Sequence, residues 1–171
     1  MIIFMEGADE TAKTHIAKAL AKKYGLQYWK NEDNEEYEDG TFHELLKYHY
    51  AKLPKMCKMF ESLHSGVVFD RNYITEAVYA EVFDRPTYRY IIRDLEETYA
   101  NMGAVTIYCY KSAHREFNDP HITFDKIRPI TDEYQLYFDT KSKMPVLHLN
   151  TTDEDLKRQL GTIGRFLKET I

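Results

Sequence analysis

The chain has 171 residues, of which 43% are hydrophobic and 30% charged, a composition typical of one folded domain with a full core. Its formal net charge of −5 argues against a non-specific nucleic-acid-binding protein, which is usually basic, and no apolar run approaches the length of a membrane span. Cys57 and Cys109 show no metal-ligand spacing and form no disulfide framework. Because no basic n-region or cleavage site precedes the first predicted strand, we expect a cytoplasmic protein.

Five short, mostly apolar runs bounded by Gly, Pro, Asn or charged residues predict β-strands. They are residues 2–5, 26–29, 66–69, 104–110 and 145–149. Helical patterns predict helices at residues 13–24, 41–53, 55–63, 74–83, 87–102, 130–140 and 153–170. Apolar strands that alternate with helices predict a single-domain α/β fold, with a five-stranded parallel sheet covered by helices on both faces.

Local signals are expected to set several helix boundaries. Pro54 lacks a backbone N–H and is expected to break or kink the helical run between residues 41 and 63. Gly103 is expected to close the helix at 87–102 as its C-cap. Thr152 and Asp155 have the spacing of a capping arrangement at the start of the last helix.

The segment from Gly7 to Thr14 has the layout of a phosphate-binding P-loop, in which a strand, a tight loop, Lys-Thr and a helix follow one another. Backbone N–H groups of such a loop and the open N-terminus of the helix stabilise an anion. Lys13 would reach the β- and γ-phosphates of ATP, and the Thr14 hydroxyl would bind Mg²⁺. The residues predicted to bind ATP are Gly7, Asp9, Glu10, Thr11, Ala12, Lys13 and Thr14.

Two residues depart from the P-loop pattern. Ala12 stands where the pattern has a glycine, which allows a close approach of the backbone to phosphate and a positive φ. Glu10 places a negative charge beside the expected phosphates. The alternative to a P-loop is an ordinary strand–turn–helix connection with Gly7 at the turn.

A second motif, Asp70-Arg71, ends the third predicted strand and leads into a helix that carries Tyr73 and Tyr79. With the P-loop at this distance, the chain resembles the thymidylate kinase and deoxynucleoside kinase group of P-loop kinases. The resemblance covers nearly the whole chain, including an acidic loop at 31–40 and a polar segment at 111–128 in the place of a lid. It implies the three-layer P-loop kinase fold, a single domain over residues 1–171, and a lid at about 111–128.

The resemblance also implies roles for individual residues. Arg71 is expected to grip a phosphate or 5′-oxygen of the acceptor, because a guanidinium binds such oxygens in a fork. Asp70 is expected to orient Arg71, contact the metal shell or accept a proton. In thymidylate kinases an acidic third P-loop residue lies near the acceptor's 3′-hydroxyl and the metal, and Asp9 holds that position. The residues expected to be catalytic are Lys13, Asp70, Arg71, Arg115 and Arg128, and those expected at the metal are Thr14 and Asp70.

The lid and the acceptor pocket supply the remaining candidates. Arg115, Lys126 and Arg128 are expected to close over the transferring phosphoryl group and exclude water. Phe42, Tyr48, Tyr73 and Tyr79 are candidates for stacking on the acceptor base, although each is also an ordinary core residue by type. Glu32 is a candidate acidic residue after the second strand. The predicted acceptor-binding residues are Asp9, Glu32, Phe42, Arg71, Tyr73 and Tyr79.

These expectations favour a Mg-ATP-dependent kinase that phosphorylates a (deoxy)nucleoside monophosphate, dTMP-like in character. A close alternative is a deoxynucleoside 5′-kinase, since Asp9 favours a monophosphate acceptor and the acidic second loop favours a nucleoside. An alternative of another class, motivated by Glu10 and Ala12, is a nucleotide-binding protein without catalysis. The expected partners are small nucleotides or nucleosides, with no membrane and no nucleic acid. A homodimer through the amphipathic helices 74–83 and 87–102 is compatible with the resemblance.

Overall fold

The computed structural model describes residues 1–30, 41–113, 122–153 and 155–170, with the backbone alone for 41–50. Its centre is a parallel five-stranded sheet in the order β2-β3-β1-β4-β5. The strands are β1 (Ile2–Glu6), β2 (Gln27–Lys30), β3 (Val67–Asp70), β4 (Val105–Tyr110) and β5 (Val146–Asn150). Each begins and ends within about one residue of its predicted position, so the predicted parallel sheet is confirmed.

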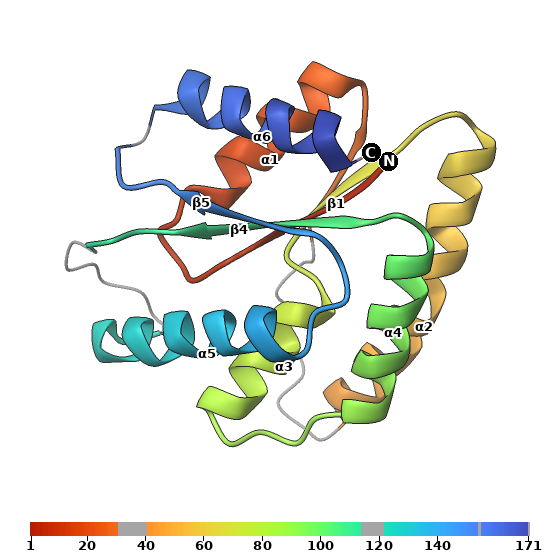
Figure 1. The fold of residues 1–171 in the computed structure, drawn as a ribbon. Helices are drawn as coiled ribbons and strands as arrows, with labels where there is room; N and C mark the ends of the chain where they lie inside the picture. The colour runs from red at the N-terminus through yellow and green to blue at the C-terminus, as the bar shows by residue number, and fades with distance from the viewer. Residues whose placement is uncertain (31–40, 114–121, 154, 171) are drawn as a thin grey trace.

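Helices cover both faces of the sheet (Figure 1). One face carries α1 (Lys13–Tyr24) and α6 (Leu156–Thr170), which pack against each other. The other face carries α2 (Thr41–Ser62), α3 (Tyr73–Val82), α4 (Arg89–Asn101) and α5 (Ile127–Thr140), the last preceded by the short 3₁₀ turn η1 (Phe124–Lys126). This is the predicted three-layer α/β architecture. Among the described helices, none is both long enough and apolar enough to cross a bilayer.

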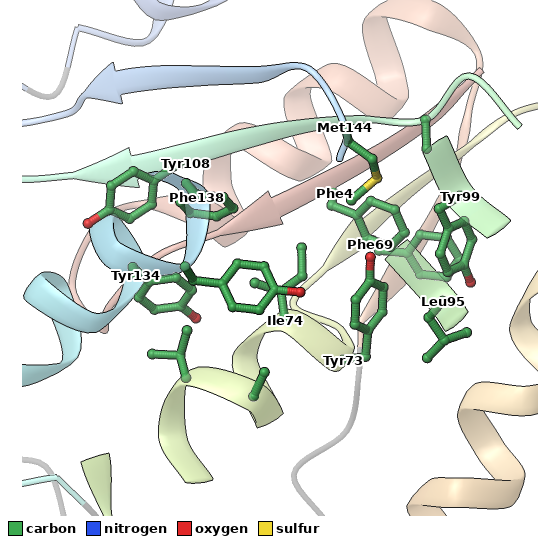
Figure 2. Packing of buried hydrophobic residues seen from close by; sticks show 14 of the residues in the cluster. Phe4, Phe69, Tyr73, Ile74, Leu95, Tyr99, Tyr108, Tyr134, Phe138 and Met144 are labelled. Atoms are coloured by element: carbon green, nitrogen blue, oxygen red, sulfur yellow. The ribbon is translucent and has the colours of Figure 1, made fainter. Parts of the chain in front are cut away.

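Alternate residues of the central strand β1 point into two separate cores. Ile3 and Met5 pack in the core under α1 and α6, where Ile16 is also buried. Phe4 points to the opposite face and stacks on Phe69, with ring centroids 5.2 Å apart. Tyrosines are the largest fully buried side chains of that second core, and Figure 2 shows Tyr73, Tyr99, Tyr108 and Tyr134 among them. A strand buried on both faces has to be apolar throughout, which explains the continuous apolar runs in the sequence.

Several helix boundaries differ from the prediction: α4 begins at Arg89 instead of residue 87, α5 at Ile127 instead of 130, and α6 at Leu156 instead of 153. Of the break or kink expected at Pro54, the break is wrong, because α2 runs through the proline from Thr41 to Ser62. Leu53 and Cys57, on either side of the proline, are buried, and their packing offsets the lost backbone hydrogen bond. The cap of α6 is Asp155 instead of Thr152, since its carboxylate accepts a hydrogen bond from the N–H of Arg158 at 3.0 Å.

Gly103 follows the end of α4 with a φ of +69°, as its predicted role requires. The N–H of Ala104, the residue after it, donates to the carbonyl of Tyr99 at 3.0 Å and closes the last turn.

Candidate active site

The loop between β1 and α1 contains three residues with a positive φ, a backbone conformation that favours glycine. Gly7 has a φ of +139°, and a Cβ at this position would lie 2.1 Å from the carbonyl oxygen of Cys109, so glycine is required. Ala12 caps α1 with a φ of 60°, in the left-handed region. Glycine adopts this conformation more readily than a residue with a Cβ, which accounts for the glycine at this position of the P-loop pattern. Glu10 is also left-handed, with a φ of 62°.

Lys13 lies inside this loop. Its side chain is buried, and the ammonium donates to the carbonyl oxygen of Ala8 and to the hydroxyl of Thr11, the latter at 3.3 Å. Burial, together with the positive charge of Arg71, lowers the pKa of Lys13 to about 8. The loop therefore supplies two oxygen partners for the buried ammonium.

The carboxylate of Asp70, the last residue of β3, links this strand to α1 and to β2. One of its oxygens accepts hydrogen bonds from the Thr14 hydroxyl at 2.6 Å and from the Tyr28 hydroxyl at 2.8 Å. A hydroxyl and a carboxylate fit Mg²⁺, which binds few protein oxygens and keeps waters and substrate phosphates as its other ligands. Within the described part of the chain, no cluster of three or more His, Cys, Asp or Glu suggests a different metal site.

Arg71, Asp9 and Tyr79 form a closed triangle of contacts. The guanidinium of Arg71 forms an ion pair with the Asp9 carboxylate and donates to the Tyr79 hydroxyl at 3.1 Å. That hydroxyl in turn donates to the other oxygen of Asp9 at 2.8 Å. Burial alone would raise the pKa of Asp9, but the charges of Arg71 and Lys13 hold it below its usual value. The Arg71 side chain also lies over the Tyr79 ring, 5.3 Å from its centroid.

A buried acid that sequence reasoning missed lies beside this triangle. Glu6, the last residue of β1, is fully buried, and its carboxylate accepts hydrogen bonds from Thr75 at 2.6 Å and from Tyr134 at 3.2 Å. Its second oxygen has no hydrogen-bond partner among the described residues. Burial raises the pKa of Glu6 to about 7. The signal in the sequence is an acidic residue that ends an apolar strand directly before Gly7.

The loop, Asp70 and Arg71 line one open pocket of about 690 Å³. Six of the seven predicted ATP-binding residues face it, from Asp9 to Thr14; Gly7 lies in the loop without lining the pocket. Its further lining residues, which sequence reasoning did not single out, are His15, Lys18, Lys30, Lys111 and Gln159. The lining therefore combines four lysines and Arg71 with three acidic residues, Asp9, Glu10 and Asp70.

Several predicted site residues lie elsewhere. Tyr73 is a core residue, which corrects its predicted contact with the acceptor: it is 0% exposed, stacks on Tyr99 at 5.8 Å and donates to Glu96 at 3.1 Å. Arg128 is 92% exposed at the start of α5, beside Asp132, and does not line the pocket. Glu32 and Arg115 lie outside the described residues, as do the side chains of Phe42 and Tyr48.

Neither a protein-family model nor a curated protein sequence matches the chain. Solved structures do match it over nearly its full length. The YorR protein of Bacillus subtilis, in complex with phosphorylated GDP, has a TM-score of 0.73 at 22% identity, and the match covers 99% of this chain and 96% of that one. Deoxyadenosine kinase of M. mycoides, with dCMP and dCDP bound, has a TM-score of 0.63 at 17% identity, covering 99% and 100%.

Thymidylate kinase of Ehrlichia chaffeensis has a TM-score of 0.62 at 14% identity, and the match covers 98% of both chains. These similarities show the fold: a single sheet-and-helix unit of the kind found in P-loop nucleoside and nucleotide kinases.

Proposed function

We propose that the protein transfers the γ-phosphoryl group of Mg-ATP to a (deoxy)nucleoside monophosphate, with dTMP-like compounds as the first candidates. The observation that carries this proposal is the Asp9–Arg71–Tyr79 triangle, which lies beside Lys13, Thr14 and Asp70. A phosphate-binding loop and an arginine suited to an acceptor phosphate thus share one site. Structural similarity to thymidylate and deoxyadenosine kinases supports the same reaction class.

On the donor side, the loop and Lys13 would hold the phosphates of ATP. Bound Mg²⁺, held by Thr14 and Asp70, would neutralise charge on the β- and γ-phosphates. Lys13 already has a buried position and two oxygen partners within the loop, and phosphate oxygens would replace these partners. The residues contribute alignment and charge stabilisation, which is most of what phosphoryl transfer requires of a protein.

On the acceptor side, Arg71 would exchange part of its contact with Asp9 for the acceptor phosphate, and one oxygen of that phosphate would attack the γ-phosphorus as ADP leaves. Asp9 would then face the sugar hydroxyls, and the Tyr79 ring would lie against the base or sugar. Lys30 and Lys111 also line the pocket. These cations favour a monophosphate acceptor over a neutral nucleoside, since the former brings additional negative charge.

A second candidate, a nucleotide-binding protein without catalysis, is favoured by two features of the loop. Ala12 holds a left-handed backbone that costs a non-glycine residue about 1 kcal/mol or more, and Glu10 faces the phosphate pocket. The charge of Glu10 would repel ATP phosphates, and the Ala12 methyl group stands where glycine would let a phosphate approach more closely. Both features would weaken the binding of ATP without preventing the binding of other ligands.

An ADP-release assay decides among these functions. The purified protein and Mg-ATP are tested with each common nucleoside and nucleoside monophosphate, and Lys13→Ala is compared with Lys22→Ala, an exposed lysine on the same helix. Turnover with one monophosphate, lost in Lys13→Ala and kept in Lys22→Ala, would support the proposal. Turnover with nucleosides alone would point to a deoxynucleoside 5′-kinase. A folded protein that binds nucleotide and turns over none of them would establish the non-catalytic alternative.

A further inference from the structure

A second cavity is lined by residues of α3, α4 and α5 and of the segments that follow α3 and α5. These three helices cover the same face of the sheet (Figure 1). Its volume is about 270 Å³, and it shares no lining residue with the P-loop pocket. The cavity is smaller than a typical pocket for a drug-sized molecule, which begins at about 300 Å³, and therefore suits a compact ligand. Its lining residues are Ala77, Glu81, Thr87, Arg89, Ile92, Arg93, Glu96, Tyr137, Lys141 and Lys143.

One wall of this cavity is apolar and consists of Ala77, Ile92 and the ring of Tyr137. The carboxylate of Glu96 is buried there, and both of its oxygens already accept hydrogen bonds. The donors are the hydroxyls of Tyr73 and Tyr137 and the backbone N–H of Lys143, at 3.1, 2.8 and 2.9 Å. Glu96 therefore belongs to the packing of the helices. An aromatic ring would find apolar contact and a tyrosine ring in the same wall.

The rim of the cavity is basic, although the whole chain carries a net negative charge. Arg89, Arg93, Lys141 and Lys143 line it, against the acidic Glu81 and the hydrogen-bonded Glu96. Each of these basic side chains has an acidic neighbour: Glu81 lies beside Arg89 at 2.9 Å, Asp94 beside Arg93 at 3.5 Å, Glu133 beside Lys141 at 3.5 Å, and Glu97 beside Lys143. Exposed pairs of this kind contribute at most about 1 kcal/mol, so an anionic ligand can share or replace these partners.

We propose that this cavity is a second ligand site, which binds a one-ring organic molecule carrying a single acidic group such as a phosphate monoester or a carboxylate. The ring lies against Ile92 and Tyr137, and the acidic group faces the basic rim. This inference does not depend on the proposed kinase activity, because it rests on a separate cavity.

The helices that line the cavity also carry residues of the P-loop site. On α3, Tyr79 contacts Asp9 in the P-loop site and Glu81 lines the cavity. On α5, Tyr134 contacts Glu6 and Tyr137 lines the cavity. A ligand between these helices contacts the elements that hold the acceptor side of the site.

Nuclear magnetic resonance of methyl-labelled protein tests the proposal, with phenyl phosphate as the probe. Ile92 and Ala77 report on the cavity, and Ala8 and Ala12 report on the P-loop. We expect saturable shifts at Ile92 and Ala77, and much weaker binding of benzyl alcohol, which has the ring without the charge. Inorganic phosphate, which has the charge without the ring, is expected to leave Ile92 unshifted.

The charge requirement is tested with Arg93→Gln/Lys141→Gln, a pair of rim positions outside the core. We expect the Kd for phenyl phosphate at Ile92 to rise roughly threefold to tenfold, which is the range for two exposed ionic contacts. Arg165→Gln/Lys168→Gln, which removes the same charge from the exposed face of α6, is the matched control and should leave the Kd unchanged. Shifts confined to Ala8 and Ala12, equal affinity for benzyl alcohol, or an unchanged Kd in the rim variant would each overturn the proposal.

Discussion

The hydroxyl of Thr14 donates a hydrogen bond to the carboxylate of Asp70 at 2.6 Å, although the two residues are 56 positions apart in the sequence. Thr14 lies in the first turn of α1, and Asp70 ends β3, the strand paired with β1. The pairing places Met5 opposite Asp70, so the P-loop and the Asp-Arg motif leave the sheet side by side. This relationship makes Asp70 the residue on which a metal role for the site is most directly tested.

Replacement of Asp70 by asparagine should lower the apparent affinity of the site for Mg²⁺. The amide keeps the size of the side chain and accepts from Tyr28, but it removes the charge that favours a divalent cation. We expect the Mg²⁺ concentration for half-maximal activity to rise, or the activity to fall, by about 10–100-fold. Titration of activity with Mg²⁺ at saturating ATP measures the change. Asp139→Asn, at an exposed position of α5, is the control, and a Mg²⁺ profile for Asp70→Asn equal to that of the control would exclude the metal role.

Replacement of Arg71 by lysine should raise the KM for the acceptor with little change in the KM for ATP. Lysine keeps the charge but lacks the planar fork that contacts Asp9 and Tyr79 together and that would bind two phosphate oxygens. A loss of one or two charge-assisted hydrogen bonds corresponds to roughly 10–100-fold in KM. Steady-state kinetics with each substrate varied in turn separates the two effects. Equal rises in both KM values would show that Arg71 supports the site as a whole, against its assignment to the acceptor.

The order of strands and helices could be predicted because it is encoded locally, in apolar runs and in glycine and charged boundaries. Lys13, Thr14, Asp70 and Arg71 could be placed near one another because the carboxyl ends of neighbouring parallel strands meet at one edge of a sheet. The register between β1 and β3 then brings the two motifs together. These parts of the site depend on spacing along the chain and on topology.

Other parts depend on contacts that local patterns do not contain. Tyr73 and Tyr79 are aromatic residues of one helix, and six positions turn a helix through about 240°, so they face different sides. The sequence does not say which side meets the site, and the structure places Tyr73 in the core. Glu6 resembles a strand-end acid in the sequence. Its burial depends on Thr75 and Tyr134, which come from two distant helices.

Replacement of Ala12 by glycine should stabilise the protein. Ala12 has a φ of 60°, which costs a residue with a Cβ about 1–2 kcal/mol, partly offset by the greater freedom of glycine in the unfolded chain. We expect a net gain of about 0.5–1 kcal/mol, or a rise in Tm of roughly 1–4 °C, measured by thermal unfolding. Ala19→Gly makes the same chemical change in the interior of α1 and should instead destabilise by about 1 kcal/mol. A loss of stability in both variants would contradict the strain assigned to Ala12.

Replacement of Glu6 by glutamine should remove a dependence of stability on pH. Burial raises the pKa of Glu6 from 4.5 to about 7 in the folded protein. Below about pH 4.5 the carboxyl is protonated in the folded and unfolded states alike, and its ionisation has no effect on stability. Between pH 4.5 and 7 the folded state retains a proton that the unfolded state has released, so the free energy of unfolding falls as the pH rises. Above pH 7 the loss is complete, at about 3 kcal/mol.

Glutamine does not titrate in this range, so the free energy of unfolding of Glu6→Gln relative to the unaltered protein should increase by about 3 kcal/mol from pH 4.5 to pH 8. Urea unfolding at a series of pH values measures this difference. Glu97→Gln, at an exposed position where Lys143 lowers the pKa of the carboxylate, is the control and should show no such increase. Parallel stability curves for Glu6→Gln and the unaltered protein would mean that Glu6 keeps an ordinary pKa. The carboxylate would then be ionised in the folded state at neutral pH, stabilised by the neighbouring charges of Arg71 and Lys13 in spite of its burial.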